Sequence, residues 1–295
     1  MADVLKKFPS LCCPACRATQ FTESPESLRC EACGESYALV DGKYPRMLHA
    51  AAAVSFEEIE VQDEVAEHYR DTRYSNPWSK KYHESWTELM VSGVDTAGPI
   101  LDNGCGIGEL HERLPDAAIT ALDISAEMVR IAGEKYERVL IGDSQRLPFE
   151  DGSFDLVMAR SLLHHLPEPE TGVGEIGRVL RPGGRVVAID TNSSLVSYLP
   201  RLIANRGEHF SEEHKNLRRK ELLASFAGEF EIERVHFFGY LAYPILGFPD
   251  LMDLFKYVPF KRFSYGALMG IDGILSHIPL LRSQAWGLLV QARKK

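Results

Sequence analysis

The sequence predicts an α/β protein with a seven-stranded, mostly parallel sheet, a small cysteine-rich module before it and a helical lid inserted near its end. Short apolar runs alternate with helical patterns between residues 99 and 190, which is typical of a parallel sheet with helices on both faces. Two further strand patterns follow near the C-terminus, and five of the six cysteines lie within the first 33 residues. The predicted strands are 99–101, 118–122, 139–141, 154–158, 185–189, 231–238 and 286–292.

The composition is that of an ordinary globular chain. It has 295 residues, of which 45% are hydrophobic and 25% charged, which excludes disordered and collagen-like proteins. A formal net charge of −9 disfavours unaided binding to nucleic acid. The first residues show no signal-peptide pattern, and no apolar run reaches the ~18 residues that a membrane-spanning helix needs. We therefore expect a cytoplasmic protein.

The N-terminal cysteines form two CxxC pairs, Cys13 with Cys16 and Cys30 with Cys33, with 13 residues between the pairs. Two thiolates three positions apart on a tight turn can bind one tetrahedral ion, and a second such turn completes four-fold coordination. Because four thiolates leave no open position, we expect structural Zn²⁺ in a ribbon of residues 1–48. A redox dithiol is the alternative, which two matched pairs disfavour. Cys12 breaks the spacing and is interpreted as a spare thiol.

The stretch from Tyr37 to Leu48 carries a first resemblance. It resembles the tail of small zinc-ribbon proteins that activate methyltransferases, and the module is also similar to the ribbon fused to 23S rRNA guanine-N1 methyltransferases. The second resemblance implies RNA as a partner. The rRNA enzymes usually place a histidine among the metal ligands, whereas this sequence offers only cysteines.

Residues 49–97 are predicted to form a helical cap of two helices separated at Asn76-Pro77. The core, residues 98–295, then opens with a strand that runs into the glycine-rich turn Gly104–Gly108 and a helix expected to start near Glu109. A dinucleotide site of the GxGxxG type needs glycine at position 109, and a carboxylate there is a poor neighbour for a pyrophosphate. The turn therefore favours a cationic ligand.

Acidic residues follow the next two strands. Asp123 ends the second strand, where a carboxylate can accept hydrogen bonds from both hydroxyls of a ribose. Asp143 ends the third strand and could accept a hydrogen bond from an adenine amine. Helix capping explains either acid taken alone. Capping does not predict that both acids stand in register with the glycine turn and Asp102. The three acids together therefore indicate an adenosine-shaped site. A helix is expected next, over 126–136.

These residues resemble the class I S-adenosylmethionine-dependent methyltransferases, in particular the branch that methylates quinones and other small molecules. The similarity continues through residues 147–155, 164–166 and 175–184. It implies a Rossmann-like sheet in which only the last strand is antiparallel, S-adenosylmethionine as cofactor, and methyl transfer as the reaction. It also implies a set of cofactor-binding residues, with Leu147 beside the adenine: Asp102, Asn103, Gly104, Cys105, Gly106, Gly108, Asp123, Ile124, Asp143, Ser144 and Arg160.

Two histidines are candidates for catalysis. His164 and His165 lie just past the fourth strand, and an imidazole is the usual general base where an acceptor must lose a proton. The alternative is that the pair packs and hydrogen-bonds its loop. His209 and His214 are weaker candidates.

The segment 240–281 is richer in apolar residues than the chain as a whole, and it predicts a lid, placed at about 240–283, over a hydrophobic acceptor. A helical cover packed on the sheet is the alternative. Lys256, Lys261 and Arg262 flank apolar residues as in an interfacial helix, so peripheral membrane contact is a further expectation. Methylation of a small, hydrophobic acceptor at O, N or C is thus the first hypothesis for function. The alternatives are methylation of an rRNA or tRNA base recruited by the ribbon, and a non-catalytic interaction module.

Overall fold

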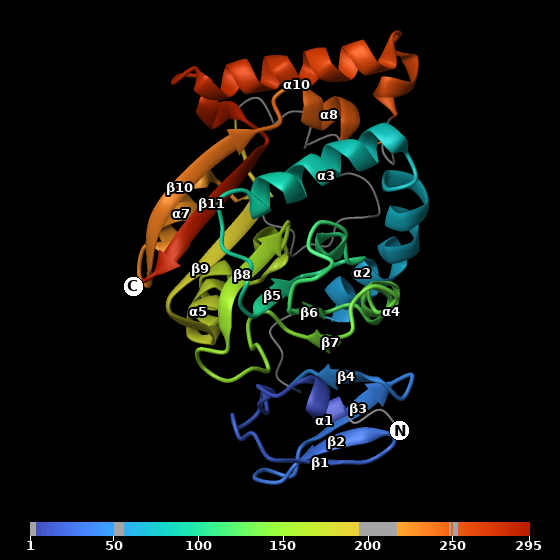
Figure 1. Ribbon diagram of the computed structural model, residues 1–295, viewed down its shortest axis with the longest axis vertical. Coiled ribbons are helices and arrows are strands. Elements are labelled where there is room, and N and C mark those ends of the chain that lie inside the picture. Colours follow the sequence, from blue (N-terminus) through green and yellow to red (C-terminus); the bar gives the residue numbers. More distant parts are fainter. Residues whose placement is uncertain (1–3, 50–55, 195–216, 248, 250–252) are drawn as a thin grey trace.

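The computed structural model describes residues 4–49, 56–194, 217–247, 249 and 253–295; the histidines at 209 and 214 lie outside these ranges. The predicted strand positions are all occupied by strands of one twisted sheet (Figure 1). Their bounds are β5 Ile100–Asn103, β6 Ile119–Asp123, β7 Val139–Gly142, β8 Phe154–Arg160, β9 Leu180–Thr191, β10 Phe230–Phe238 and β11 Gly287–Lys294. In space they follow the order β7-β6-β5-β8-β9-β11-β10.

Strand β11 lies between β9 and β10 and is antiparallel to both. The pairs among β7, β6, β5, β8 and β9 are all parallel. Alternate residues of these strands belong to different apolar clusters: Leu101 and Val157 to one, Ile100 and Met158 to the other. Because side chains alternate across a sheet, the two clusters are its two faces. Both faces are covered, as expected for parallel strands.

The predicted count of seven strands is wrong, because the sheet has eleven. The four additional strands come from the ribbon: β1 Phe21–Glu23, β2 Ser27–Cys30, β3 Ser36–Val40 and β4 Tyr44–Met47, after the short helix α1 Val4–Lys7. They form an antiparallel meander, and β4 then pairs in parallel with β7, Arg46 opposite Ile141 and Met47 opposite Gly142. The ribbon thus covers the edge of β7 that would otherwise be an exposed edge of the sheet.

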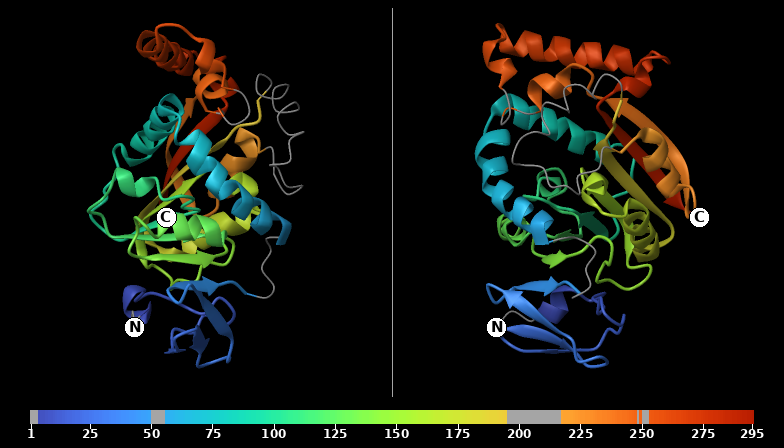
Figure 2. Two further views of the ribbon diagram at one scale, coloured as in Figure 1. Left: turned by 90° about the vertical axis from the view of Figure 1, so that its right-hand side faces the viewer. Right: turned by 180° about the vertical axis from the view of Figure 1, so that it is seen from behind.

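The predicted cap consists of helix α2 Phe56–His68, a π-helical turn η1 Tyr69–Arg73 and helix α3 Pro77–Val91. The break at Asn76-Pro77 is confirmed: the Asn76 side chain accepts hydrogen bonds from the backbone N–H groups of Trp78 and Ser79, and Pro77 occupies the first helical position. Figure 2 shows both helices beside the core, on the face that also carries α4 Ala126–Ala132.

Two helix predictions need correction. The helix expected near Glu109 is a single 3₁₀ turn, η2 Leu110–Glu112, because Pro115 follows and the chain must return to the sheet at Ile119. The helix expected over 126–136 ends at Ala132, where Gly133 is the C-cap residue. The helices α5 Pro169–Val179 and α7 Arg219–Phe226 pack on the opposite face of the sheet.

The insert between β10 and β11 contains α8 Ala242–Leu246, the 3₁₀ turns η4 Leu254–Tyr257 and η5 Arg282–Gln284, and α10 Lys261–His277. The long helix α10 lies at the end of the molecule farthest from the ribbon, as all views agree (Figures 1 and 2). Within the described ranges, no helix is both long and apolar enough to cross a membrane.

Candidate functional site

The glycine turn after β5 depends on glycine at several positions. Gly104, Gly106 and Gly108 have φ values of 74°, 51° and 81°, in the left-handed region that glycine adopts at least cost. A Cβ on Gly104 would come within 3.0 Å of a methyl carbon of Leu162. The turn is tied to β6 because the backbone N–H groups of Gly104 and Cys105 both donate to the Leu122 carbonyl, at 2.8 and 3.0 Å. It is therefore a fixed, side-chain-poor surface that another molecule can approach closely.

Three carboxylates stand at the carboxyl ends of the neighbouring strands β5, β6 and β7. Asp102 and Asp123 are the acids of β5 and β6, and Asp143 directly follows β7; all three are buried. Asp123 accepts hydrogen bonds from the backbone N–H of Gly106 at 2.8 Å and of Ser125 at 3.1 Å. Burial raises the pKa of Asp123, and these backbone donors oppose that rise. The sequence correctly placed the three acids together, because parallel strands end at one edge of a sheet.

Asp102 has a partner that the sequence analysis missed. The Tyr136 hydroxyl donates to its Oδ2 at 2.5 Å and accepts from the His111 backbone N–H at 3.1 Å. Burial raises the pKa of Asp102 to about 6, against the lowering effects of the Tyr136 hydrogen bond and the charge of Arg160. Burial also raises the pKa of Tyr136 far above its usual value, so the phenol stays protonated and acts as the hydrogen-bond donor to Asp102. Tyr136 lies four residues beyond the end of α4, and no local pattern marks it.

Arg160 ends β8 and joins the cap to the glycine turn. Its guanidinium donates to the Tyr74 hydroxyl at 2.6 Å and the Thr87 hydroxyl at 3.1 Å, and it pairs with Glu109. Lys135, on the other side of the turn, pairs with Glu112 at 3.2 Å. These two cations beside the turn are thus already paired with carboxylates, which makes the turn a poor phosphate clamp.

The backbone of Ser161, the next residue, has a φ of 53°, which is strained for a residue with a Cβ. Ser144 donates its hydroxyl to Asn103 Oδ1 at 2.8 Å, which joins the ends of β5 and β7. Ile124, between Asp123 and the α4 N-cap residue Ser125, is partly exposed. Cys105 is buried, and its burial raises the pKa of the thiol far above its usual value.

His164 and His165 form the 3₁₀ turn η3 Leu163–His165 after β8, with ring centroids 4.2 Å apart. His164 is buried, and its Nδ1 lies 2.6 Å from Oδ1 of Asp190 on β9. Burial alone would raise the pKa of Asp190, but the charge of His164 and hydrogen bonds lower it, so Asp190 stays ionised. Asp190 was missed, although it is one more acid near the carboxyl end of a parallel strand, the signal that identified Asp123 and Asp143.

The four predicted cysteines converge. The sulfur atoms of Cys13, Cys16, Cys30 and Cys33 all lie within 4.8 Å of one another, with 3.7 Å from Cys13 to Cys33 and 3.6 Å from Cys16 to Cys30. Zn–S bonds of about 2.3 Å in a tetrahedron require sulfur atoms ~3.8 Å apart, so the spacing fits the ion. Arg17 and Gly34, which directly follow the two pairs, have positive φ values of 66° and 79°. Cys12 stands outside this group.

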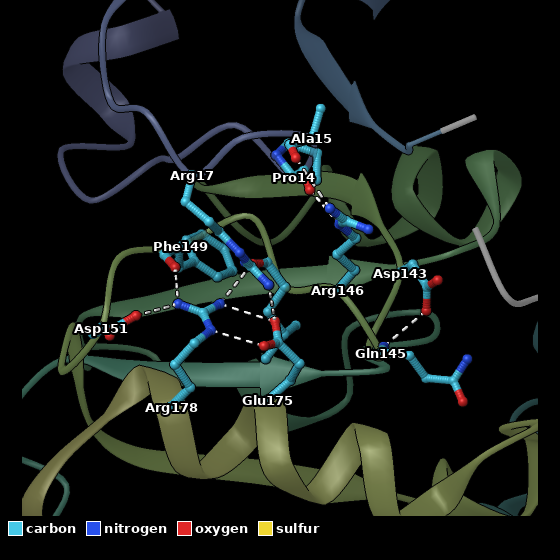
Figure 3. A network of polar contacts seen from close by, with 11 residues as sticks. Pro14, Ala15, Arg17, Asp143, Gln145, Arg146, Phe149, Asp151, Glu175 and Arg178 are labelled. Atoms are coloured by element: carbon cyan, nitrogen blue, oxygen red, sulfur yellow. Dashed lines mark hydrogen bonds and ion pairs between the residues drawn. The ribbon is translucent and has the colours of Figure 1, made fainter. Parts of the chain in front are cut away.

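The first cysteine turn also holds the loop that carries Asp143 (Figure 3). Arg146 donates to the backbone carbonyls of Pro14 and Ala15. Arg17 donates to the Leu147 carbonyl at 2.8 Å and pairs with Glu175 at 3.0 Å. Two backbone hydrogen bonds continue the contact, from Cys12 N–H to the Pro148 carbonyl and from Glu150 N–H to the Ser10 carbonyl. Since β4 pairs with Ile141 and Gly142, the ribbon holds the 143–150 loop from both ends.

Comparison with known proteins gives concordant results. The family described as "Methyltransferase domain" matches residues 101–188. The demethylmenaquinone methyltransferase of Staphylococcus aureus (strain JH9) is 31% identical over 144 residues, which are 45% of this chain and 60% of that protein. The chain thus matches less than two thirds of the length of this curated relative.

Solved structures share the fold. The crystal structure of the [4+2]-cyclase SpnF has a TM-score of 0.57 at 21% identity, covering 82% of this chain and 97% of that one. A chain from the complex between the Haloferax volcanii Trm112 methyltransferase activator and a methyltransferase has a TM-score of 0.52 at 18% identity, covering 81% and 97%. Residues 101–188 of this protein therefore match the family described as "Methyltransferase domain", and the chain shares the fold of these two solved structures.

Proposed function

We propose that the protein transfers a methyl group from S-adenosylmethionine to a small, hydrophobic acceptor. The observation that carries the proposal is the row of buried acids, Asp102, Asp123 and Asp143, along the glycine turn, where Arg160 and Lys135 are already paired with carboxylates. Such an edge suits a nucleoside that carries positive charge and no phosphate. The cofactor supplies an electrophilic methyl on a sulfonium, so the protein has to bind, orient and exclude water.

The cofactor contacts proposed here are those that the resemblance to class I methyltransferases implies for these residues. Asp123 would bind the ribose hydroxyls, Asp143 with Ser144 would bind the adenine, and Ile124 and Leu147 would contact the adenine ring. Asp102 and the turn that includes Asn103 and Cys105 would hold the methionine part, and the backbone at Arg160 would bind its amine. The strained backbone of Ser161 and the close approach at Gly104 support this end of the site.

His165 is the better candidate for a general base. His164 is buried and held by Asp190, so it serves to position the turn, whereas His165 is partly exposed beside it. The charge of His165 lowers the pKa of Asp123, against the larger effect of burial. An acceptor O–H, N–H or acidic C–H would transfer its proton to His165 as its oxygen, nitrogen or carbon forms the bond to the methyl.

The hydrophobic acceptor is supported by the apolar insert at about 240–283 and by the name of the quinone-methylating relative. The fold by itself does not decide the reaction, since one structure that shares it is named a cyclase.

An RNA acceptor recruited by the ribbon and a non-catalytic module remain the competing hypotheses. Two backbone carbonyls of the ribbon's first cysteine turn accept hydrogen bonds from Arg146 of the core. This contact favours a role for the ribbon within the protein over a role in RNA binding. Zn²⁺ bound by Cys13, Cys16, Cys30 and Cys33 would be structural.

Two variants separate binding from turnover. Asp123→Ala should abolish the heat of S-adenosylmethionine binding in calorimetry while the circular dichroism stays native. His165→Ala should keep cofactor affinity and lower kcat by about 100-fold, because the acceptor would lose the group that takes up its proton. Methyl-labelled cofactor incubated with cell extract, followed by mass spectrometry of the organic and RNA fractions, identifies the acceptor class. Unchanged binding by Asp123→Ala would refute the site, label confined to RNA would refute the hydrophobic acceptor, and tight binding without labelled product would favour the non-catalytic module.

A further inference from the structure

The end of the molecule opposite the ribbon carries an unusual concentration of exposed apolar side chains. Among the described residues, every large hydrophobic side chain that is exposed lies between Leu241 and Leu281. The most exposed define what we name the apolar end surface: Tyr257 at 80%, Phe260 at 84%, Phe263 at 78%, Ile274 at 67% and Leu280 at 86%. Soluble monomers rarely expose such a contiguous group without a binding partner.

The helix that carries much of this surface is firmly attached. The inner side of α10 buries Tyr265 and Asp272, and it packs against β10 and α8. The Asp272 carboxylate accepts hydrogen bonds from the backbone N–H groups of Tyr240 at 2.9 Å and Leu241 at 2.8 Å. The exposure of Phe263 and Ile274 is therefore a property of an ordered helix and is not due to a frayed end.

The outer side of α10 is apolar along most of its length. Its exposed positions between Phe263 and Ile274 are glycine, alanine or isoleucine: Gly266, Ala267, Gly270, Ile271 and Gly273. No charged side chain is exposed in this stretch, since Asp272 is buried on the inner side of the helix. A helix face in contact only with water would normally be polar, so this face is suited to an apolar environment.

Most charges around the apolar end surface are positive. Residues 253–282 contain the cations Lys256, Lys261, Arg262 and Arg282 and two acids, of which Asp272 is buried and Asp253 accepts a hydrogen bond from the Lys256 backbone N–H. The chain as a whole has a net charge of −9, so this end is opposite in sign to the rest of the molecule. Aromatic and aliphatic side chains rimmed by lysine and arginine match the boundary of a bilayer whose headgroups are anionic. A second copy would bring two cationic rims together, which disfavours self-association.

We propose that the apolar end surface docks on an anionic lipid bilayer, with Phe260 and Phe263 inserted at the headgroup boundary and the exposed cations Lys256, Arg262 and Arg282 in contact with lipid phosphates. The helix lies along the membrane and does not cross it. The proposal stands on exposure and charge alone and is independent of methyl transfer.

Co-sedimentation of the full chain with vesicles tests the proposal. The protein should pellet with equimolar phosphatidylcholine and phosphatidylglycerol but stay in solution with phosphatidylcholine alone. The double variants Phe260→Ser/Phe263→Ser and Lys256→Glu/Arg262→Glu should each reduce the bound fraction at least tenfold. Arg29→Glu/Lys43→Glu changes the charge equally on exposed positions of the ribbon, and should bind as the wild type does. Circular dichroism and unfolding temperature confirm that each variant folds.

Wild-type protein that remains in solution with both vesicles would overturn the proposal, as would equal loss of binding in the ribbon control. Sedimentation velocity would then show whether a second copy of the chain covers the apolar end surface. A dimer abolished by Phe260→Ser/Phe263→Ser would assign the surface to a second copy. A monomer that does not bind vesicles would mean that another segment of the chain or a protein partner covers it.

Discussion

Asp102 is a buried carboxyl whose ionisation the fold opposes. Its pKa rises from 3.8 to about 6, so the folded protein holds this proton more tightly than the unfolded chain does. The contribution of the protonated Asp102 carboxyl to the free energy of unfolding is therefore fully present below about pH 4 and is lost as the pH rises through about 6. A positively charged cofactor beside Asp102 would lower this pKa, so we expect cofactor affinity to increase over the same pH range.

Asp102→Asn should remove this pH dependence. The amide stays neutral and can still accept the Tyr136 hydrogen bond. Between about pH 4 and pH 7, the wild type should lose on the order of 3 kcal/mol more unfolding free energy than the variant does, because a shift of about two pKa units is worth that amount. Urea unfolding at the two pH values measures it. An equal pH dependence in both proteins would contradict the assignment of the titration to Asp102.

At the scale of elements, the ribbon positions the loop that we assign to adenine. Arg146 is the link, because its guanidinium binds two carbonyls of the first cysteine turn while Asp143 and Ser144 precede it on the same loop. If the four cysteines bind Zn²⁺ as proposed, the ion would keep the shape of the cysteine turn, and the turn would then keep the loop that carries Asp143 in place.

Arg146→Ala should weaken S-adenosylmethionine binding by about tenfold, which corresponds to about 1.4 kcal/mol for two lost charge-assisted hydrogen bonds. The matched control is Arg130→Ala, which removes the ion pair at 2.8 Å between the ribbon's Asp41 and α4 without touching the loop. Calorimetric titration of both variants with cofactor checks the prediction. A similar loss in both would show that the ribbon stabilises the protein in general and does not position the loop in particular.

For the whole molecule, the ribbon and the sheet share one apolar core. Phe8, Leu11 and Met47 of the ribbon belong to the same buried cluster as Leu101 and Phe149 of the core. Together with the β4–β7 pairing, this cluster couples the two parts, so neither should unfold alone.

Calorimetry should therefore show a single unfolding transition for the zinc-loaded chain. Removing the metal with a chelator should lower its midpoint by roughly 6–12 °C, since a loss of about 3 kcal/mol has that effect in a domain of this size. The Cys30→Ser variant should have the lower midpoint with or without chelator. Two separate transitions, only one of which responds to the chelator, would contradict a shared core.

The strands, the glycine turn and the acids at the strand ends could be determined from the sequence by itself. Apolar runs, glycine spacing and strand-end positions are local features, and parallel strands bring their carboxyl ends together by geometry. The four cysteines were likewise recognisable, because ligand spacing within each turn is local. The missing helix after Glu109 is the exception, where Pro115 and the short return to β6 overrode the local pattern.

Only the tertiary structure decided which distant segments meet. The pairing of β4 with β7 joins residues about 95 positions apart and turns a seven-stranded sheet into one of eleven. The partners of Asp102, Arg160 and His164, and the bonds from Arg146 to the cysteine turn, come from segments that no local pattern connects. Such contacts depend on how the chain packs as a whole, because a hydrogen bond is set by final positions in space and not by spacing along the sequence.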